Sequence, residues 1–201
     1  ARNKRGNRKS EYAMMELELL SVLAEKAGKA YPTEELNRMW EMILTNQFHD
    51  ILPGSSIHEV YEQTKKEYAE IAETSAKLIG ERLDALCAKK DESVTVWNTL
   101  GHRRNDIVEL GANSAEALTD GTNVYPVQQT KDGAVIYAEN LPSKGYQVLR
   151  PVSGAAVETP FAVTEAGEGY TLETPFYTIE INANGEFTSL FDKENDREVL
   201  Q

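Results

Sequence analysis

The chain has 201 residues, enough for one large domain or two modest ones, each with its own hydrophobic core. Its formal net charge of -12 at pH 7 argues against nucleic acid or an anionic membrane as a partner, because both attract cationic surfaces. No apolar run approaches the roughly 20 residues of a membrane span. The single cysteine, Cys87, excludes an intrachain disulfide and a cysteine-based zinc site, and it favours a cytoplasmic location.

Positive charge is concentrated at the start of the chain, where five of the first ten residues are cations: Arg2, Lys4, Arg5, Arg8 and Lys9. Such a run occurs in nucleic-acid tags, in solvated helix starts and in arms that lie on another domain, and the acidic remainder favours the last two. Because the chain opens on Ala1 inside a helix-like pattern, we expect it to be a segment of a longer protein.

Apolar residues recur at helical spacing up to Asp91 and predict three helices. The first is expected to end near Gly28, with an apolar side made of Tyr12, Met15, Leu19, Leu20 and Leu23. The second is expected to begin with Thr33 as its N-cap, with a stripe of Leu36, Met39, Trp40, Ile43 and Leu44. The third is expected to begin with a capping box, Ser56-x-x-Glu59, and its apolar stripe includes Ile57, Val60, Tyr61, Thr64, Tyr68, Ile71, Ser75, Leu78, Ile79, Leu83 and Leu86.

After Asp91 the period changes to that of short strands separated by turn residues. The expected strands are 93–98, 106–110, 124–129, 134–138, 146–150, 170–173, 177–182 and 187–192, with Asn184-Gly185 as the strongest hairpin signal. Residues 151–159 are expected to form a loop or a link between sheets.

The predicted fold class is therefore multidomain, α then β. An antiparallel three-helix bundle over residues 1–91 is followed by an antiparallel β-sandwich-like domain over residues 92–201. Because the chain ends soon after a hairpin, the β region is expected to be incomplete, with an exposed edge strand.

The stretch richest in chemistry is Asn46-Gln47-Phe48-His49-Asp50-Ile51-Leu52-Pro53-Gly54-Ser55-Ser56, where the second helix ends. Imidazole and carboxylate both bind divalent metals and both hold sugar hydroxyls. His49 beside Asp50 is therefore either a metal ligand or, more often for an isolated pair, a hydrogen-bonded helix end. The chain has no His-x-His, His-x-Asp or His-x-x-x-His motif to complete a metal site, and His58 and His102 are expected at the surface.

Other catalytic constellations are missing from the sequence. Glycoside hydrolysis needs two carboxylates flanking the bond, and no such pair stands out among the many acids on solvated helix faces. Trp40 and Tyr61 have rings that stack on sugars, yet both fall on the apolar stripes, which favours core packing.

The eleven-residue stretch resembles a segment of the class II α-mannosidases, glycoside hydrolase family 38, and its sequence is most similar to that of the bacterial and cytosolic members. Three other stretches are similar to that family in the same order: Lys4–Glu11, Val96–Arg104 and Ile181–Asp192. The resemblance implies a zinc-dependent hydrolase that cleaves α-mannosidic bonds with retention. It implies His49 as a zinc ligand and Asp50 as a residue that binds a mannose hydroxyl.

In that family the catalytic nucleophile, the acid/base carboxylate and the remaining zinc ligands lie in an N-terminal α/β domain, which this sequence does not contain. The resemblance thus implies that the chain acts with that domain as its partner on an α-mannoside and is inactive alone. Two other interpretations stay open. One is a non-catalytic carbohydrate-binding or protein-interaction module, and the other is a self-contained metal protein that uses His49, Asp50 and His58.

Overall fold

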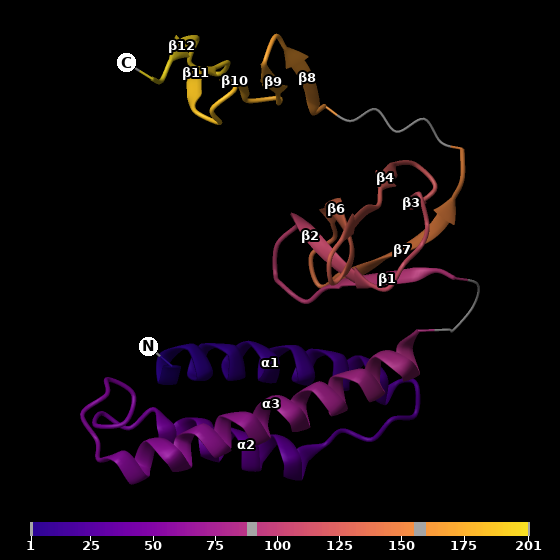
Figure 1. Ribbon diagram of the computed structural model, residues 1–201. Helices are drawn as coiled ribbons and strands as arrows, with labels where there is room; N and C mark the ends of the chain where they lie inside the picture. The colour runs from indigo at the N-terminus through magenta and orange to yellow at the C-terminus, as the bar shows by residue number, and fades with distance from the viewer. Residues whose placement is uncertain (1, 88–91, 155–159, 201) are drawn as a thin grey trace. The chain divides into compact units, whose positions relative to one another are not determined.

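The computed structural model describes residues 2–87, 92–154 and 160–200, and it divides into two compact units, 1–152 and 153–201. Three helices come first, α1 (Arg2–Glu25), α2 (Thr33–Asn46) and α3 (His58–Leu86). They run up, down and up, so that α1 and α3 are parallel and α2 is antiparallel to both (Figure 1). None of the helices in the described ranges has the length and hydropathy needed to cross a membrane.

The helices meet along seams with the three-four spacing of a heptad repeat. The buried positions are Asn7, Ser10, Met14, Leu17, Leu20, Ser21 and Ala24 on α1, Leu36, Met39, Ile43 and Asn46 on α2, and Thr64, Ile71, Ser75, Leu78 and Arg82 on α3. The apolar side predicted for the first helix was partly wrong, because Tyr12 and Met15 are more than half exposed. Leu44 of the second predicted stripe and Ile57 of the third are also more than half exposed. Large apolar side chains marked the expected faces, whereas the packed seams also use small and polar residues.

The bundle interior is apolar in its middle and polar towards both ends. Its apolar core consists of Met14, Leu17, Leu36, Met39, Ile43, Ile71 and Leu78, with Trp40 half-buried beside it and hydrogen-bonded to Glu18. At one end the Arg82 guanidinium, with only 3% of the residue exposed, donates to the Ala30 carbonyl at 3.2 Å and to Ser21 Oγ at 3.3 Å. It also pairs with Glu81, which in turn pairs with Lys29. A buried cation in this setting has its hydrogen-bond donors satisfied and its charge balanced at the surface.

The helix ends differ in detail from the expected caps. The side chain of Thr33 makes no capping hydrogen bond, and α2 begins instead after Pro32, whose carbonyl accepts from Leu36 N. Gly28 follows the end of α1 with a φ of +84°, which confirms it as a left-handed residue close to the helix terminus.

Two antiparallel sheets follow the bundle within the first unit. One has the order β1 (Val94–Asn98), β7 (Gly145–Val152), β3 (Ala117–Thr119) and β4 (Val124–Pro126), and the other has the order β2 (Arg104–Gly111), β6 (Gly133–Leu141) and β5 (Gln128–Thr130). Both sheets contribute to one core that includes Val96, Leu118, Tyr125, Ile136, Leu141 and Leu149. A shared core between two antiparallel sheets is the sandwich-like arrangement expected from the sequence.

Two polar side chains organise the loops of this sandwich. The buried amide of Asn98 donates to the carbonyls of His102, Leu141 and Pro142 and accepts from Leu100 N. The Asp120 carboxylate accepts from the backbone N–H groups of Thr122 and Asn123, from the Tyr125 hydroxyl and from the Gln147 amide.

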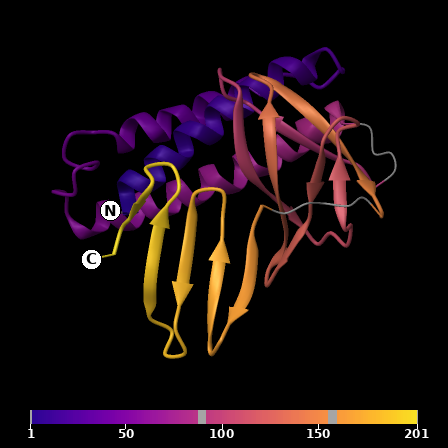
Figure 2. The same cartoon turned by 90° about the horizontal axis from the view of Figure 1, so that it is seen from above.

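The second unit is a five-stranded antiparallel sheet of the order β12 (Arg197–Glu198), β11 (Phe187–Asp192), β10 (Tyr177–Ile181), β9 (Gly169–Glu173) and β8 (Ala162–Ala166), seen as a row of strands in Figure 2. The hairpin predicted at Asn184-Gly185 is confirmed between β10 and β11, and Gly185 has a φ of +80°. Cross-strand neighbours Val163, Leu172, Ile179 and Leu190 share one face of this sheet.

The helix-then-antiparallel-strand architecture is thus confirmed, while β3, β8 and β12 were not predicted. The residue 91/92 boundary stays a prediction, because residues 88–91 lie outside the described residues. The expected 151–159 link overlaps the end of β7 and otherwise falls largely on residues 155–159, also outside the described ones.

We expect Arg82→Met to lower the free energy of unfolding by about 2 kcal/mol, because it leaves the Ala30 carbonyl and the Ser21 hydroxyl without their charged donor. Arg38→Met is the matched control, since it removes an exposed ion pair to Glu70 and is expected to cost under about 1 kcal/mol. Urea unfolding followed by Trp40 fluorescence, in chains in which Trp97 is replaced by Phe, measures both. An equal loss of unfolding free energy in the two variants would show that the buried contacts of Arg82 stabilise the bundle no more than an exposed ion pair does.

The Asp120 carboxylate makes the stability of the sandwich depend on pH. Burial alone raises its pKa, but the hydrogen bonds from the N–H groups of Asn123 and Thr122 and from neighbouring side chains outweigh burial and lower the pKa from 3.8 to about 2. Since the folded-state pKa lies below the ordinary value, the stabilisation is present above about pH 4 and is lost as the pH falls towards 2.

Asp120→Asn is therefore expected to lower the melting temperature at pH 7, with the gap to the unmodified chain narrowing below about pH 4 and closing as the pH falls to about 2. Trp97 fluorescence reports on this part of the chain when Trp40 is replaced by Phe. Asp132→Asn, at an exposed turn, makes the same charge change as a control. A gap that stays constant across this pH range would contradict the prediction.

Candidate functional site

The C-terminal end of α2 is fixed by a layer of polar side chains between the three helices. Asn46, only 2% exposed, donates its amide to Glu67 Oε2 at 2.8 Å and accepts from the Thr64 hydroxyl at 3.1 Å, both on α3. The Gln47 amide donates to Asn7 Oδ1 at 3.0 Å and to Glu11 Oε1 at 2.9 Å, both on α1. Two consecutive residues thus tie α2 to both neighbours just before the chain turns.

Residues 47–56 form an irregular turn that leads from α2 to α3, and its organising atom is the carbonyl oxygen of Asp50. Ser56 Oγ donates to this oxygen at 2.8 Å, and Ser55 Oγ and the Tyr61 hydroxyl each lie 3.4 Å from it. The Tyr61 oxygen also accepts from Ser56 N at 2.8 Å. The Asn3 amide donates to the carbonyl of Ile51, which attaches the turn to α1.

This arrangement corrects two expectations. Ser56 does not form a capping box with Glu59, because α3 begins after Ile57 without a side-chain cap and the Ser56 hydroxyl is used by Asp50. Tyr61 is not a core residue, since its ring is half-buried and its hydroxyl braces the turn. Gly54, with a φ of +110°, adopts a backbone conformation that other residues rarely enter.

The side chains of His49 and Asp50 point out of this fixed turn. They are 75% and 57% exposed, and His49 Nε2 lies 3.3 Å from Asp50 Oδ2. The imidazole also contacts the Phe48 ring, with the centroids 4.2 Å apart and the planes tilted by 44°. The backbone is therefore held by buried contacts, while the two chemically active groups remain available.

A zinc ion needs three or four protein ligands, of which this pair supplies at most two. The described residues contain no group of three or more His, Cys, Asp or Glu side chains placed to hold a metal ion. This finding does not support the interpretation in which His49, Asp50 and His58 form a complete site. His58 begins α3 and His102 follows Gly101 in a bend, and both are exposed as expected. The donor set fits a metal only if other ligands come from elsewhere.

The residues that position the pair were missed by the sequence analysis. Asn46, Gln47 and Thr64 are polar and were either unassigned or taken as part of an apolar stripe. The sequence feature that could have revealed Asn46 and Thr64 is their place at heptad positions, where a polar residue buried in a bundle specifies helix register.

Comparisons with known proteins bear on the helical part first. The family profile described as "Alpha mannosidase middle domain" matches residues 1–86. Human "Alpha-mannosidase 2C1" is 29% identical over the whole chain, and "Alpha-mannosidase G" of Dictyostelium discoideum is 22% identical over the same span. Residues 1–86 thus match the α-mannosidase middle domain, and the whole chain is similar in sequence to α-mannosidases.

The fold is similar to that of two solved structures. A solved Enterococcus faecalis structure, described as a protein in the glycosyl hydrolase family 38, matches 98% of the chain with a TM-score of 0.63 at 16% identity. A second, described as an α-mannosidase from Enterococcus faecalis V583, also matches with a TM-score of 0.63 at 17% identity. The chain spans only 18% of the human relative and 29% of the first solved structure.

We expect Ser56→Ala to lower the free energy of unfolding by about 1 kcal/mol and to speed amide hydrogen exchange in residues 50–56, because the 2.8 Å bond to the Asp50 carbonyl is lost. Ser55→Ala removes the neighbouring hydroxyl at 3.4 Å and is the control, with less than half that effect. Hydrogen exchange read by mass spectrometry on peptides of the turn distinguishes them. Indistinguishable exchange in the two variants would exclude Ser56 as the brace.

Proposed function

We propose that the chain supplies one side of the active site of a zinc-dependent retaining α-mannosidase, with the exposed His49–Asp50 pair as its contribution. The observation that carries the proposal is that these two side chains stand free on a turn whose backbone is pinned to all three helices. A site residue needs such a combination, because a ligand must be reachable and yet held within a fraction of an ångström.

His49 is assigned the role of a zinc ligand through a ring nitrogen. A zinc ion held there would supply Lewis acidity and a fixed point of attachment for the sugar, which would favour the distorted ring of an oxocarbenium-like transition state. The remaining ligands, the nucleophile and the acid/base carboxylate are assigned to parts of the parent enzyme outside these 201 residues.

Asp50 is assigned to substrate binding. Its carboxylate is exposed beside the imidazole and accepts hydrogen bonds, so it suits a sugar hydroxyl as a donor. The contact at 3.3 Å to His49 Nε2 also orients the ring in the absence of substrate. The main chain on both sides is held by Gln47 and Ser56, which leaves the Asp50 side chain as the adjustable element.

The proposed substrates are α-mannosides, and the proposed location is cytoplasmic. The names of the relatives support the first, and the lone, half-buried Cys87 is compatible with the second. The alternative of a non-catalytic module lacks a comparable supporting observation, since every comparison above leads to α-mannosidases.

The decisive experiment uses the complete parent enzyme. His49→Ala is expected to remove stoichiometric zinc and to reduce kcat for an aryl α-mannoside by at least about 100-fold, the upper range for disturbing a metal's surroundings. His58→Ala, an exposed histidine on the neighbouring helix, is the matched control and should keep both metal and rate. Metal analysis by mass spectrometry and steady-state kinetics give the readout.

Unchanged zinc content and rate in His49→Ala would refute the ligand assignment. Asp50→Asn separates the second role, because it should keep zinc while lowering kcat/KM by roughly 10- to 100-fold, as expected when one charged hydrogen bond is lost.

A further inference from the structure

The hydrogen bonds of the turn fix its main chain but not the orientation of the His49 imidazole. The side chain is 75% exposed, so burial does not limit rotation about its two torsions. A metal ligand, in contrast, has to be held within about 0.5 Å and roughly 10–20° of its working geometry. An exposed zinc ligand therefore needs neighbouring side chains that restrict these torsions.

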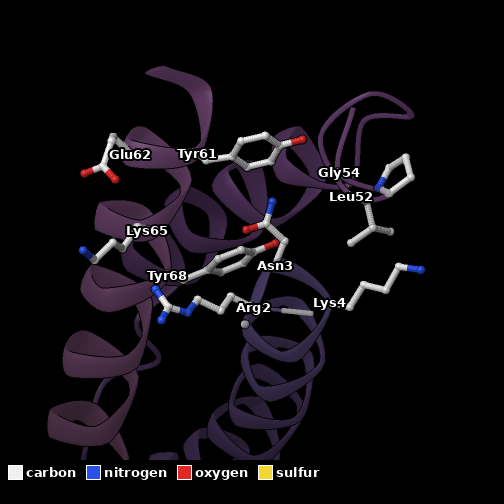
Figure 3. Close-up of a pocket in the computed structure, with 11 residues that line it drawn as sticks. Arg2, Asn3, Lys4, Leu52, Gly54, Tyr61, Glu62, Lys65 and Tyr68 are labelled. Atoms are coloured by element: carbon white, nitrogen blue, oxygen red, sulfur yellow. The ribbon is translucent and has the colours of Figure 1, made fainter. Parts of the chain in front are cut away.

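The frame that carries the turn is a close junction of α1 and α3. Tyr61 and Tyr68 of α3 and Asn3 of α1 border a pocket of about 520 Å³ beside residues 52–54 of the turn (Figure 3). The Tyr68 ring packs directly onto Gly6, where a Cβ would lie 2.7 Å from Tyr68 Cδ2. The Tyr68 hydroxyl is buried and has no hydrogen-bond partner among the described residues, so this contact is made by the ring alone. The turn thus rests on two helices that touch beneath it.

Phe48 is held on this frame through its own backbone. Its N–H donates to the Thr45 carbonyl at 3.1 Å, and its carbonyl accepts from the N–H groups of Ile51 at 2.9 Å and Leu52 at 3.1 Å. Its ring is 54% exposed and lies outside the apolar core of the bundle. The ring is therefore placed at the surface by a fixed main chain and not by burial among the helices.

Two side chains contact the imidazole, and the proposed reaction makes different demands on them. Asp50 Oδ2 lies 3.3 Å from His49 Nε2, whereas the centroid of the Phe48 ring lies 4.2 Å from that of the imidazole, with the planes tilted by 44°. Asp50 is assigned to a mannose hydroxyl, so a bound substrate competes for its carboxylate. A phenyl ring has no polar atom to offer a metal or a hydroxyl. Its contact with the imidazole therefore persists when both are bound.

We propose that Phe48 is a positioning residue, which restricts rotation of the His49 imidazole and so orients it for the metal of the proposed site. The inference rests on the proposed function for the metal, while the contact between the two rings is independent of it. Aromatic pairs at such separations stabilise one arrangement by an amount that corresponds to about a 2- to 10-fold change in an equilibrium constant.

The first test needs neither metal nor activity and uses NMR of the His49 side chain in the 201-residue chain. Phe48→Leu should move the His49 ring-proton shifts towards those of the exposed His58, because the ring current is lost. The three-bond couplings about the His49 Cα–Cβ bond should become averaged at the same time. Phe48→Tyr keeps an aromatic ring and should preserve both signals. Phe187→Leu removes another exposed phenyl ring, on a different sheet, and is the matched control.

The second test measures zinc affinity in the complete parent enzyme by competition with a chromogenic chelator. Phe48→Leu should raise the zinc dissociation constant by about 2- to 10-fold, because a mobile imidazole has more freedom to lose on binding. Phe48→Tyr should return the constant to within about twofold of the unmodified enzyme, since the pair of rings is kept. Phe187→Leu should leave it unchanged. Loss of side-chain volume alone does not predict this rescue by Tyr.

Two results would overturn the proposal. One is His49 shifts and couplings that are the same in Phe48→Leu as in the unmodified chain, and the other is a raised zinc dissociation constant that Phe48→Tyr does not restore. The melting temperature of Phe48→Leu should stay within about 2 °C of the unmodified chain, because a ring more than half exposed adds little burial. A larger fall would assign Phe48 to folding and would also overturn the positioning role.

Failure of the proposed function gives a different pattern. If His49→Ala keeps its zinc, the ligand assignment is refuted, and the NMR comparison still decides whether Phe48 orients the imidazole. Averaged couplings in Phe48→Leu would support that orientation, and unchanged couplings would overturn it.

Discussion

The candidate site depends on the polar layer that closes one end of the helical bundle. Asn46 and Gln47 extend the buried seam of α2 by one polar turn, and their amides bind acceptors on α3 and α1 respectively. An amide at such a position has a fixed set of partners, so a shift of one helix past another breaks several hydrogen bonds at once. The seam therefore fixes the register of the bundle, and the register fixes where Phe48, His49 and Asp50 emerge.

The turn itself is held through hydrogen bonds to its backbone carbonyls rather than through the side chains of His49 and Asp50. Ser56 and Tyr61 bind the Asp50 carbonyl, and the Asn3 amide binds that of Ile51, so the main chain of the turn is braced by its own Ser56 and by residues of α1 and α3. This leaves the His49 and Asp50 side chains free of contacts that hold the turn, apart from their contact with each other and that of His49 with Phe48. The division explains how groups exposed by more than half can still occupy defined positions.

The sequence predicted the elements better than the contacts between them. Three helices, most strands and the Asn184-Gly185 hairpin follow from local periodicity and turn chemistry, which are properties of short segments. The buried side of α1 was predicted only in part, because Tyr12 and Met15 have the hydrophobicity of core residues while Asn7, Ser10 and Ser21 have the correct spacing. Burial of small polar residues is decided by partners on other helices, such as Gln47 for Asn7 and Arg82 for Ser21. A single helix pattern does not contain that information.

The site shows the same contrast at finer scale. His49 and Asp50 could be singled out from residue type and adjacency, and the structure puts their side chains in contact. The hydrogen bond from Ser56 to the Asp50 carbonyl could not be predicted, because Ser56 and Glu59 also match the sequence pattern of a capping box. Which of the two bonds forms depends on where the Asp50 carbonyl lies. The Tyr68 hydroxyl is one step further away, because its lack of a partner is visible only after α1 and α3 are packed at Gly6. Asn46 and Gln47 point into the bundle and are paired across it, so the helix register that these amides fix also determines where His49 emerges.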